Sequence, residues 1–144
     1  MSKEHEIPVR VYYEDTDSGG IVYHASYIRF AERGRTELLR NEGYQNSVLS
    51  KDVGVLFVVR HMEVDYLKPA RLDDYLTVST SIKWMRKSSL LMYQEIKHDK
   101  ETLCILKVTV VAVNLQGRPT SIPDDMREMF KKYMIPDQDN KIKD

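Results

Sequence analysis

The order of its strand-like and helix-like segments limits the fold of this chain more than any other sequence feature. A strand-like stretch at 7–13, with Val9 and Val11 on one face, precedes one long helical pattern at 25–42. The apolar or small residues that form one face of this helix recur every three or four positions, as Tyr27, Ala31, Gly34 and Leu38. Four strand-like runs then follow, at 56–66, 75–84, 90–97 and 103–115. We expect a short amphipathic helix at 123–133 to close the chain.

The connections between the later runs are short. Residues 86–88 and 98–101 join consecutive runs, which favours antiparallel neighbours because parallel strands need a longer crossover. One long helix against a five-stranded antiparallel sheet is an α+β architecture, and a doubly wound parallel sheet would need strands alternating with helices. Such a sheet has open edges and an incompletely covered face, both of which a homodimer would cover.

Two segments allow a more local prediction. Gly34 lies inside the helical pattern, where glycine costs ~0.5–1 kcal/mol relative to alanine, so we expect the helix to approach another backbone closely there. In the run at 56–66, simple alternation places Leu56, Val58 and Met62 on one face. The opposite face turns from apolar to polar halfway along, as if it left the core.

Size and composition describe one globular domain. Of the 144 residues, we assign 1–135 to that domain and 136–144 to a charged tail that we expect to be flexible. The 22 Lys and Arg balance the 22 Asp and Glu, and this formal net charge of zero argues against a dedicated nucleic-acid binder. A hydrophobic content of 42% fits a folded chain and excludes a disordered one.

Nothing in the sequence indicates a membrane or an oxidising compartment. The longest apolar stretches, such as 108–113, are far shorter than the ~18 residues that a membrane-spanning helix needs. The first residues are charged and lack the apolar segment of a secretory signal. The single cysteine, Cys104, cannot form an internal disulfide, so we expect a cytoplasmic protein.

Residues 17–24 concentrate groups that can carry out chemistry. Asp17 falls in a turn, and Gly19 and Gly20 allow a backbone to approach a ligand closely. His24 falls at the start of the long helix, where free N–H groups and the helix dipole favour negative charge. A carboxylate, an imidazole and an oxyanion site in one short segment would suit attack on an acyl carbonyl.

Simpler interpretations of the same residues remain open. Asp17 could be only a turn former or N-cap, and His24 could be a packing histidine. Glu14, Asp15 and Asp17 could form a solvated acidic loop or hold a hard cation. The sequence Asp15-Thr16-Asp17 after an apolar strand also resembles the loop of aspartate-dependent phosphatases, which need an alternating α/β core that this chain lacks. No Cys and His spacing indicates a zinc site, and no other metal site is predicted.

The stretch 10–27, RVYYEDTDSGGIVYHASY, resembles the signature of the 4-hydroxybenzoyl-CoA thioesterase family. Further similarity at 65–74, DYLKPARLDD, and at 117–119, GRP, extends the resemblance over nearly the whole chain. Within the family, the sequence is most similar to the YbgC-like branch of acyl-CoA thioesterases associated with the Tol–Pal system. The resemblance implies the hotdog fold, in which an antiparallel sheet wraps around one long helix.

The resemblance also implies roles for individual residues. It places the essential aspartate at Asp17, the histidine of this branch at His24, and a tyrosine beside them at Tyr13. The backbone N–H of His24 would be the oxyanion donor, and no cofactor is implied. Further substrate contacts in this segment would be Gly20, Val22 and Tyr23. Basic residues would hold the nucleotide end of CoA, and the candidates are Lys83, Arg86, Lys87 with the adjacent Ser88, and Arg118.

The function implied by the resemblance is hydrolysis of acyl-CoA to a free acid and CoA, with Asp17 as nucleophile or general base. Family active sites form across a homodimer, often within a dimer-of-dimers tetramer. Lipid-synthesis or acyl-carrier proteins are the implied protein partners. The alternative is a non-catalytic module on the same fold that binds acyl-CoA or acyl carrier protein.

Overall fold

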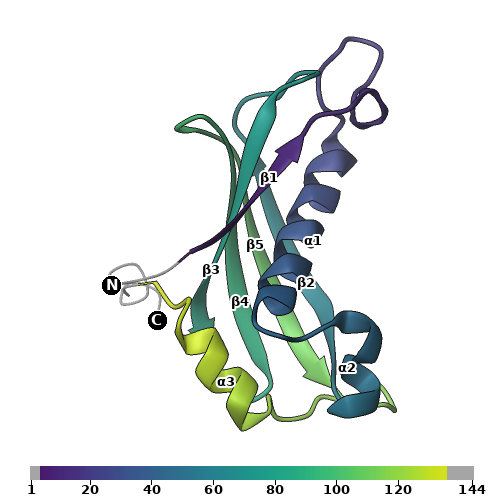
Figure 1. The fold of residues 1–144 in the computed structure, drawn as a ribbon, viewed down its shortest axis with the longest axis vertical. Coiled ribbons are helices and arrows are strands. Elements are labelled where there is room, and N and C mark those ends of the chain that lie inside the picture. Colours follow the sequence, from purple (N-terminus) through teal and green to yellow (C-terminus); the bar gives the residue numbers. More distant parts are fainter. Residues whose placement is uncertain (1–3, 136–144) are drawn as a thin grey trace.

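The computed structural model describes residues 4–135, in which a five-stranded sheet curves around one long helix (Figure 1). The strands are β1 (His5–Arg10), β2 (Leu56–Tyr66), β3 (Tyr75–Met85), β4 (Ser89–His98) and β5 (Glu101–Val113). The helices are α1 (His24–Asn41), α2 (Asn46–Asp52) and α3 (Asp124–Lys131), with a 3-10 turn, η1, at Tyr13–Asp15. The tail predicted at 136–144 lies outside the described residues.

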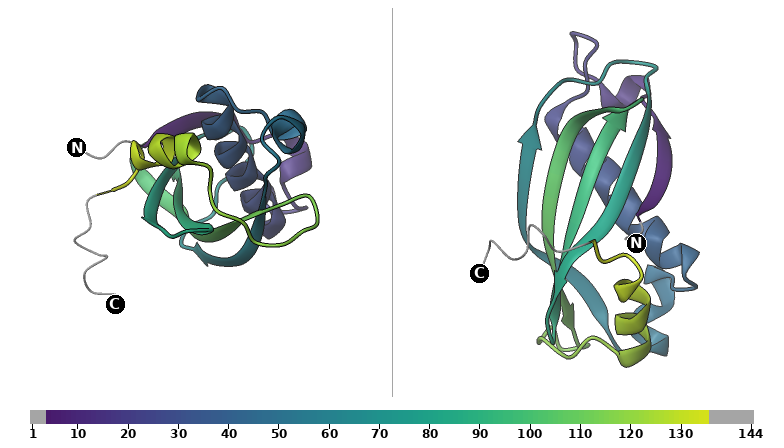
Figure 2. Two further views of the ribbon diagram at one scale, coloured as in Figure 1. Left: turned by 90° about the horizontal axis from the view of Figure 1, so that it is seen from below. Right: turned by 90° about the vertical axis from the view of Figure 1, so that its left-hand side faces the viewer.

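Neighbouring strands are antiparallel throughout the sheet, in the order β1-β3-β4-β5-β2. Figure 2 (right) shows the strands side by side with α1 behind them. The helix packs against β1, β3 and β4, while β2 keeps one edge without a neighbouring strand. The predicted α+β architecture is therefore confirmed, with β1 and β2 as the two edges. Within the described residues, no helix is both long and apolar enough to cross a membrane.

Gly34 lies where α1 presses against the sheet. A Cβ atom added there would lie 2.8 Å from Val78 Cγ1 and 3.0 Å from Gln94 Nε2. Gln94 is fully buried, and its Nε2 donates hydrogen bonds to the Ala31 carbonyl at 2.9 Å and to Thr80 Oγ1 at 3.0 Å. The predicted close approach is confirmed, although the helix meets side chains of β3 and β4 and not their backbone.

A bulge in β2 changes which residues face α1. The register against β5 shifts between Val59 and His61, so one extra residue inverts the alternation. The predicted face shared by Leu56, Val58 and Met62 was therefore wrong, because Met62 lies on the opposite side of the strand from the other two. The residues of β2 that face α1 are Phe57, Val59, Met62, Val64 and Tyr66.

The boundaries of two other elements differ from the sequence prediction. The first strand ends at Arg10 and not at residue 13, because the chain bends into η1. There the Asp15 carboxylate accepts a hydrogen bond from the Tyr12 N–H at 2.8 Å and closes the turn. The short helix α2 was not predicted, since its seven mostly polar residues carry no clear amphipathic pattern. The start of α1 at His24 agrees with the prediction.

Candidate active site

The loop that carries Asp17 is shaped by its own backbone. Asp17 Oδ1 accepts a hydrogen bond from the Gly19 N–H at 2.8 Å, and the Asp17 carbonyl accepts one from the Gly20 N–H at 3.1 Å. The Asp17 N–H in turn donates to the Ile21 carbonyl at 2.9 Å. Gly20 has a φ of 81°, a left-handed conformation that glycine adopts without strain. Local sequence therefore fixes the position of the Asp17 carboxylate.

This loop is joined to a segment more than forty residues later in the chain. The Val22 N–H donates to the Ala70 carbonyl at 2.9 Å, and the Leu72 N–H donates to the Gly20 carbonyl at 3.1 Å. The Tyr27 hydroxyl, on the first turns of α1, accepts a hydrogen bond from the Ala70 N–H at 2.9 Å. The two sequence stretches that carried the family resemblance, 10–27 and 65–74, thus meet in space.

His24 is the first residue of α1, after Tyr23 at the N-cap. Among residues 4–135, no backbone acceptor takes the His24 N–H, as expected for the first turn of a helix. The imidazole packs edge-on against the Tyr66 ring with 4.9 Å between centroids, and the Tyr66 hydroxyl donates to the His24 carbonyl at 3.3 Å. The end of β2 thereby holds the first turn of α1 in place.

Asp17 and His24 line one cavity of about 210 Å³, which we name the His24 hollow. Its other lining residues are Ile21, Val22, Tyr23, Tyr27, Tyr66, Leu67, Lys68 and Pro69. A carboxylate can act there as nucleophile or base, while an unbonded N–H at a helix N-terminus can stabilise a developing oxyanion. Burial raises the pKa values of Tyr27 and Tyr66, so both hydroxyls stay protonated near neutral pH. The hollow is thus equipped for attack on a carbonyl.

The predicted site residues do not all reach this hollow. Val22 and Tyr23 line it with Asp17 and His24, and Gly20 shapes the loop beside it. Tyr13 is 81% exposed and lines a different, open groove beside Arg10 and Leu72. Among the described residues of one chain, no hydrogen bond, ion pair or ring contact joins the Tyr13 side chain to Asp17 or His24.

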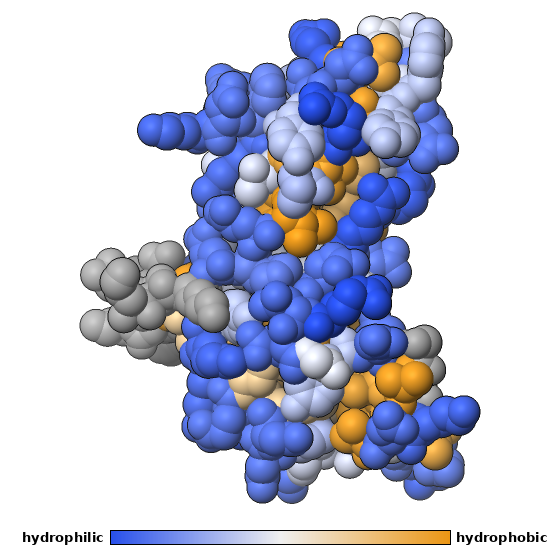
Figure 3. Space-filling model, in the orientation of Figure 1, coloured by the Kyte–Doolittle hydropathy of each residue, from blue (hydrophilic) through white to orange (hydrophobic). Residues whose placement is uncertain are grey.

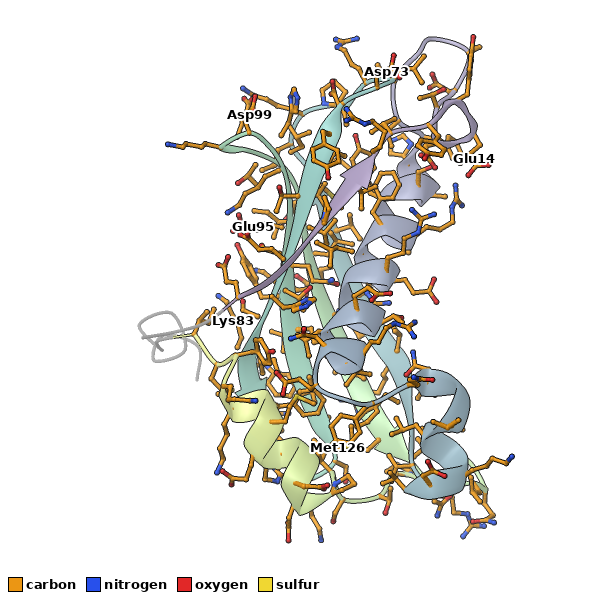
Figure 4. All side chains as sticks on the ribbon, viewed as in Figure 1. Glu14, Asp73, Lys83, Glu95, Asp99 and Met126 are labelled. Carbon is orange, nitrogen blue, oxygen red and sulfur yellow. The ribbon has the colours of Figure 1, made fainter. Side chains whose placement is uncertain are left out.

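The predicted CoA-binding residues lie at the other end of the sheet. From Tyr75, beside the acidic loop, β3 runs roughly 33 Å to Met85. Figure 4 shows Lys83 far from Glu14 and Asp73. Within one chain, the residues at the end of β3 cannot contact a ligand group that sits in the His24 hollow.

Two of the four basic side chains lie over aromatic rings, and the backbone of the β3–β4 turn is bound by α3. Lys83 Nζ lies 4.9 Å from the centroid of the Tyr93 ring, and the Arg86 guanidinium lies 4.3 Å from that of Trp84. Arg127, on α3, donates to the carbonyls of Arg86 and Lys87 at 3.1 and 2.9 Å. The remaining two candidates, Ser88 and Arg118, lie at the same end of the sheet. The Ser88 carbonyl accepts a hydrogen bond from the Ala112 N–H, and the Arg118 carbonyl accepts one from the Asn114 N–H.

The cation interpretation of the acidic loop finds little support in the geometry. Asp15 is buried and accepts the Tyr12 N–H, while Asp17 turns toward Gly19. Within residues 4–135, no group of three His, Cys, Asp or Glu side chains is placed to hold a metal ion.

The single cysteine is not a candidate nucleophile. Burial raises the pKa of the Cys104 thiol to about 12, so this residue stays protonated and is a poor nucleophile.

Tyr66 lines the His24 hollow and contacts His24, and the sequence reasoning did not single it out. It belongs to the quoted stretch 65–74, yet nothing in the one-dimensional pattern places it against His24. The contact arises because β2 and α1 converge at this end of the fold. Alternation along β2 was also a poor guide, since the bulge determines which face Tyr66 occupies.

Comparison with known proteins identifies the family. The model of the thioesterase-like superfamily matches residues 11–130. The chain belongs to this superfamily. It is 48% identical over 127 residues to the acyl-CoA thioester hydrolase YbgC of Escherichia coli O6:H1, covering 87% of this chain and 94% of that protein. It is 39% identical over 124 residues to the acyl-CoA thioesterase YbgC of Haemophilus influenzae, covering 85% and 91%.

A solved structure agrees with this assignment. The probable thioesterase of Bartonella henselae superimposes with a TM-score of 0.81 at 40% sequence identity, covering 84% of this chain and all of that one. The predicted hotdog fold is therefore confirmed, as is the prediction that the protein is a thioesterase.

Proposed function

We propose that the protein hydrolyses acyl-CoA to a free acid and CoA in the His24 hollow. The observation that carries this proposal is that one cavity is lined by both Asp17 and His24, and that no backbone acceptor among residues 4–135 takes the His24 N–H. The activity of the YbgC relatives supports the choice of acyl-CoA as the substrate class.

In this mechanism the thioester carbonyl oxygen accepts a hydrogen bond from the His24 N–H, and the helix dipole stabilises the charge that develops on it. Asp17 either attacks the carbonyl carbon or takes a proton from a water molecule that attacks it. The C–S bond then breaks, and the CoA thiolate leaves. In the first route, water hydrolyses the resulting acyl anhydride and regenerates Asp17. The His24 imidazole orients water and assists departure of the thiolate.

A second copy of the chain completes the site in this proposal. The open edge of β2 exposes Leu56, Val58 and Val59, and Figure 3 shows apolar side chains at the surface over the neighbouring α2. An open apolar edge favours pairing with another strand, and two identical edges pair about a two-fold axis. In an antiparallel pair, the beginning of one β2 lies beside the end of the other.

The same arrangement would account for the distant basic residues. The partner's β3–β4 turn, which carries Arg86, Lys87 and Ser88, lies at the end of its sheet that approaches the first subunit's His24 hollow. Basic side chains of one subunit could then bind the CoA phosphates while the thioester occupies the hollow of the other. A mass twice or four times that of the chain by light scattering is expected, and a monomer would contradict this arrangement.

Location and protein partners belong to the same proposal. A single buried thiol, Cys104, suits a reducing cytoplasm. The YbgC-like resemblance favours lipid-synthesis or acyl-carrier proteins as partners, in association with the Tol–Pal system. Affinity purification of the tagged protein from its own host should enrich such proteins, and their absence would contradict this part of the proposal.

A thiol-release assay tests the proposed activity. The purified protein is mixed with straight-chain acyl-CoAs of increasing length, and free CoA thiol is detected with a chromogenic disulfide. Catalytic release with at least one chain length is expected. Saturable binding of acyl-CoA without any release would instead identify a non-catalytic binding module.

A further inference from the structure

A second cavity lies beside α1 at the opposite end of β2. Its volume is about 140 Å³, and we name it the Arg35 hollow. Leu39, Phe57, Met92 and Phe130 give it apolar walls, while Glu32 and Arg35 contribute charge. A cavity of about this size can hold a benzene molecule, so it is large enough for part of an acyl group. The mechanism above assigns it no role.

Within the described part of its own chain, the Arg35 guanidinium forms a hydrogen bond to a neutral group and no ion pair. The side chain is partly buried, and Arg35 Nη1 donates one hydrogen bond to the neutral Gln94 Oε1 at 3.0 Å. None of the ion pairs among residues 4–135 includes Arg35. Burial lowers the Arg35 pKa, and the nearby charge of Glu32 raises it. Because guanidinium remains protonated in proteins and has five N–H donors, most of these donors are available to an acceptor from outside the chain.

The two carboxylates of β2 that could pair with the Arg35 guanidinium of a partner subunit point away from this hollow. After the bulge, Glu63 and Asp65 lie on the side of β2 opposite to Phe57 and Val59, which line the hollow. A second copy paired along β2 would therefore not bring its Glu63 or Asp65 to Arg35. A partly buried guanidinium that forms no ion pair still gains from a further acceptor, and a ligand in the hollow is a candidate source of one.

The proposed dimer places this hollow beside the catalytic centre of the other subunit, and the inference rests on that proposed function. Phe57 and Val59 lie near the beginning of β2, whereas Tyr66 ends it beside His24. Antiparallel pairing of two β2 edges brings the Arg35 hollow of one subunit next to the His24 hollow of its partner. Within one chain the two hollows face α1 at opposite ends of β2, about 30 Å apart along the strand, counted from Phe57 to Tyr66.

We propose that Arg35 of one subunit binds an acceptor oxygen on the acyl group whose thioester is held by Asp17 and His24 of the other. A carboxylate is the acceptor that matches the planar fork of guanidinium best, and a hydroxyl is a weaker one. The enzyme should therefore favour acyl-CoAs with a terminal carboxylate over unsubstituted ones of equal length. Arg35 acts in substrate selection and takes no part in the bond-breaking step.

Matched substrates test the selectivity. Pairs such as butyryl- and succinyl-CoA, or octanoyl- and suberoyl-CoA, are compared with their ω-hydroxy counterparts. For the wild type we expect kcat/KM to rise from unsubstituted to hydroxy to carboxy substrate at the best length. Arg35→Met should lower the carboxy-to-unsubstituted ratio roughly 10- to 100-fold, as expected for loss of a hydrogen-bonded charge. Arg33→Met, an exposed arginine on the same helix, is the control and should leave the ratio unchanged.

Two outcomes of this comparison would overturn the inference. If Arg35→Met lowers kcat/KM for all substrates by the same factor, Arg35 has only a structural role. If light scattering shows that Arg35→Met alone dissociates the dimer, the acceptor is a group of the partner subunit and not of the substrate. A wild type that hydrolyses no acyl-CoA would refute the proposed function itself, which is a distinguishable result.

A mixed dimer tests whether Arg35 acts across the interface. Asp17→Asn and Arg35→Met chains with different tags are co-expressed, and the heterodimer is purified through both tags. In this heterodimer the Arg35→Met chain carries the only intact Asp17. The Asp17→Asn chain carries the only intact Arg35, which in the proposed dimer lies beside that Asp17. Wild-type selectivity is expected in this heterodimer. If it keeps the reduced ratio of the Arg35→Met homodimer, Arg35 serves its own subunit and the cross-subunit placement is wrong.

Discussion

The two hollows along α1 are built in different ways. All lining residues of the His24 hollow come from two short sequence segments, 17–27 and 66–69. The Arg35 hollow collects side chains from α1, α2, α3, β2, β4 and β5. Only eleven positions, about 16 Å of helix, separate His24 from Arg35. In this fold the proposed reacting groups are local in sequence, whereas the walls that would select the acyl group depend on the whole sheet.

The largest expected effect is at the locally built hollow. Asp17→Asn should reduce thioester hydrolysis by roughly 10²–10⁴-fold, because it removes the proposed nucleophile or base. The substitution keeps an acceptor oxygen for the Gly19 N–H, so the loop and the overall fold should persist. Steady-state rates and circular dichroism check the two statements. Glu14→Gln, an exposed acid of the same loop, is the control, and equal losses in both variants would remove the special role of Asp17.

A stability effect is expected near the non-local hollow. In Gly34→Ala, the new Cβ would lie 2.8 Å from Cγ1 of the fully buried and β-branched Val78, which has little room to move. Overpacking should outweigh the better helix propensity of alanine and lower the free energy of unfolding by about 1–3 kcal/mol. Urea denaturation measures the change, with Arg33→Ala on the exposed side of α1 as the control. An increase in stability would show that α1 and the sheet separate easily here.

A smaller effect is expected from the support of His24. Tyr66→Leu removes the ring that packs against the imidazole, and a loss of roughly 2- to 10-fold in kcat is expected from such an aromatic pair. Tyr66→Phe keeps the ring and loses only the hydrogen bond to the His24 carbonyl, so it should recover most of the activity. Because Tyr66 acts through His24, the change should appear in kcat and in its pH profile more than in KM. Equal rates for the two variants would contradict this positioning role.

The smallest effect concerns the basic end of the sheet. Lys87→Ala should raise KM for acyl-CoA only a few-fold, since one exposed ion pair contributes roughly 0–1 kcal/mol. The increase should disappear with S-acyl-pantetheine, which lacks the nucleotide, and should shrink at high salt. Lys100→Ala, in the turn at the other end of β4, is the matched control. Equal KM changes for both thioesters would show that Lys87 does not contact the nucleotide.

The contrast between the hollows also explains what the sequence could predict. Asp17, the glycines and His24 belong to one turn and one helix start, whose geometry follows from neighbouring residues. Periodicity was sufficient for the long helix and the antiparallel runs. It failed at β2, where one inserted residue reverses the faces, and at the end of β1, where a carboxylate hydrogen bond closes η1. Neither feature has a periodic signature.

Contacts between distant segments were beyond sequence reasoning. Tyr66 contacts His24 only after β2 and α1 have packed together, and Arg35 contacts Gln94 only after α1 has packed against β4. The basic residues could be recognised as a group, but their distance from Asp17 is set by the length of β3. The position of Tyr13 likewise depends on a three-residue turn that alternation cannot reveal.

The central claim is that Asp17 and the His24 N–H hold the scissile thioester. The most direct test is a crystal structure with an acyl-CoA analogue whose thioester sulfur is replaced by a methylene group. The account predicts that the ketone oxygen lies about 2.7–3.1 Å from the His24 nitrogen, with the Asp17 carboxylate facing the carbonyl carbon. A fully occupied analogue whose carbonyl lies outside the His24 hollow would contradict it.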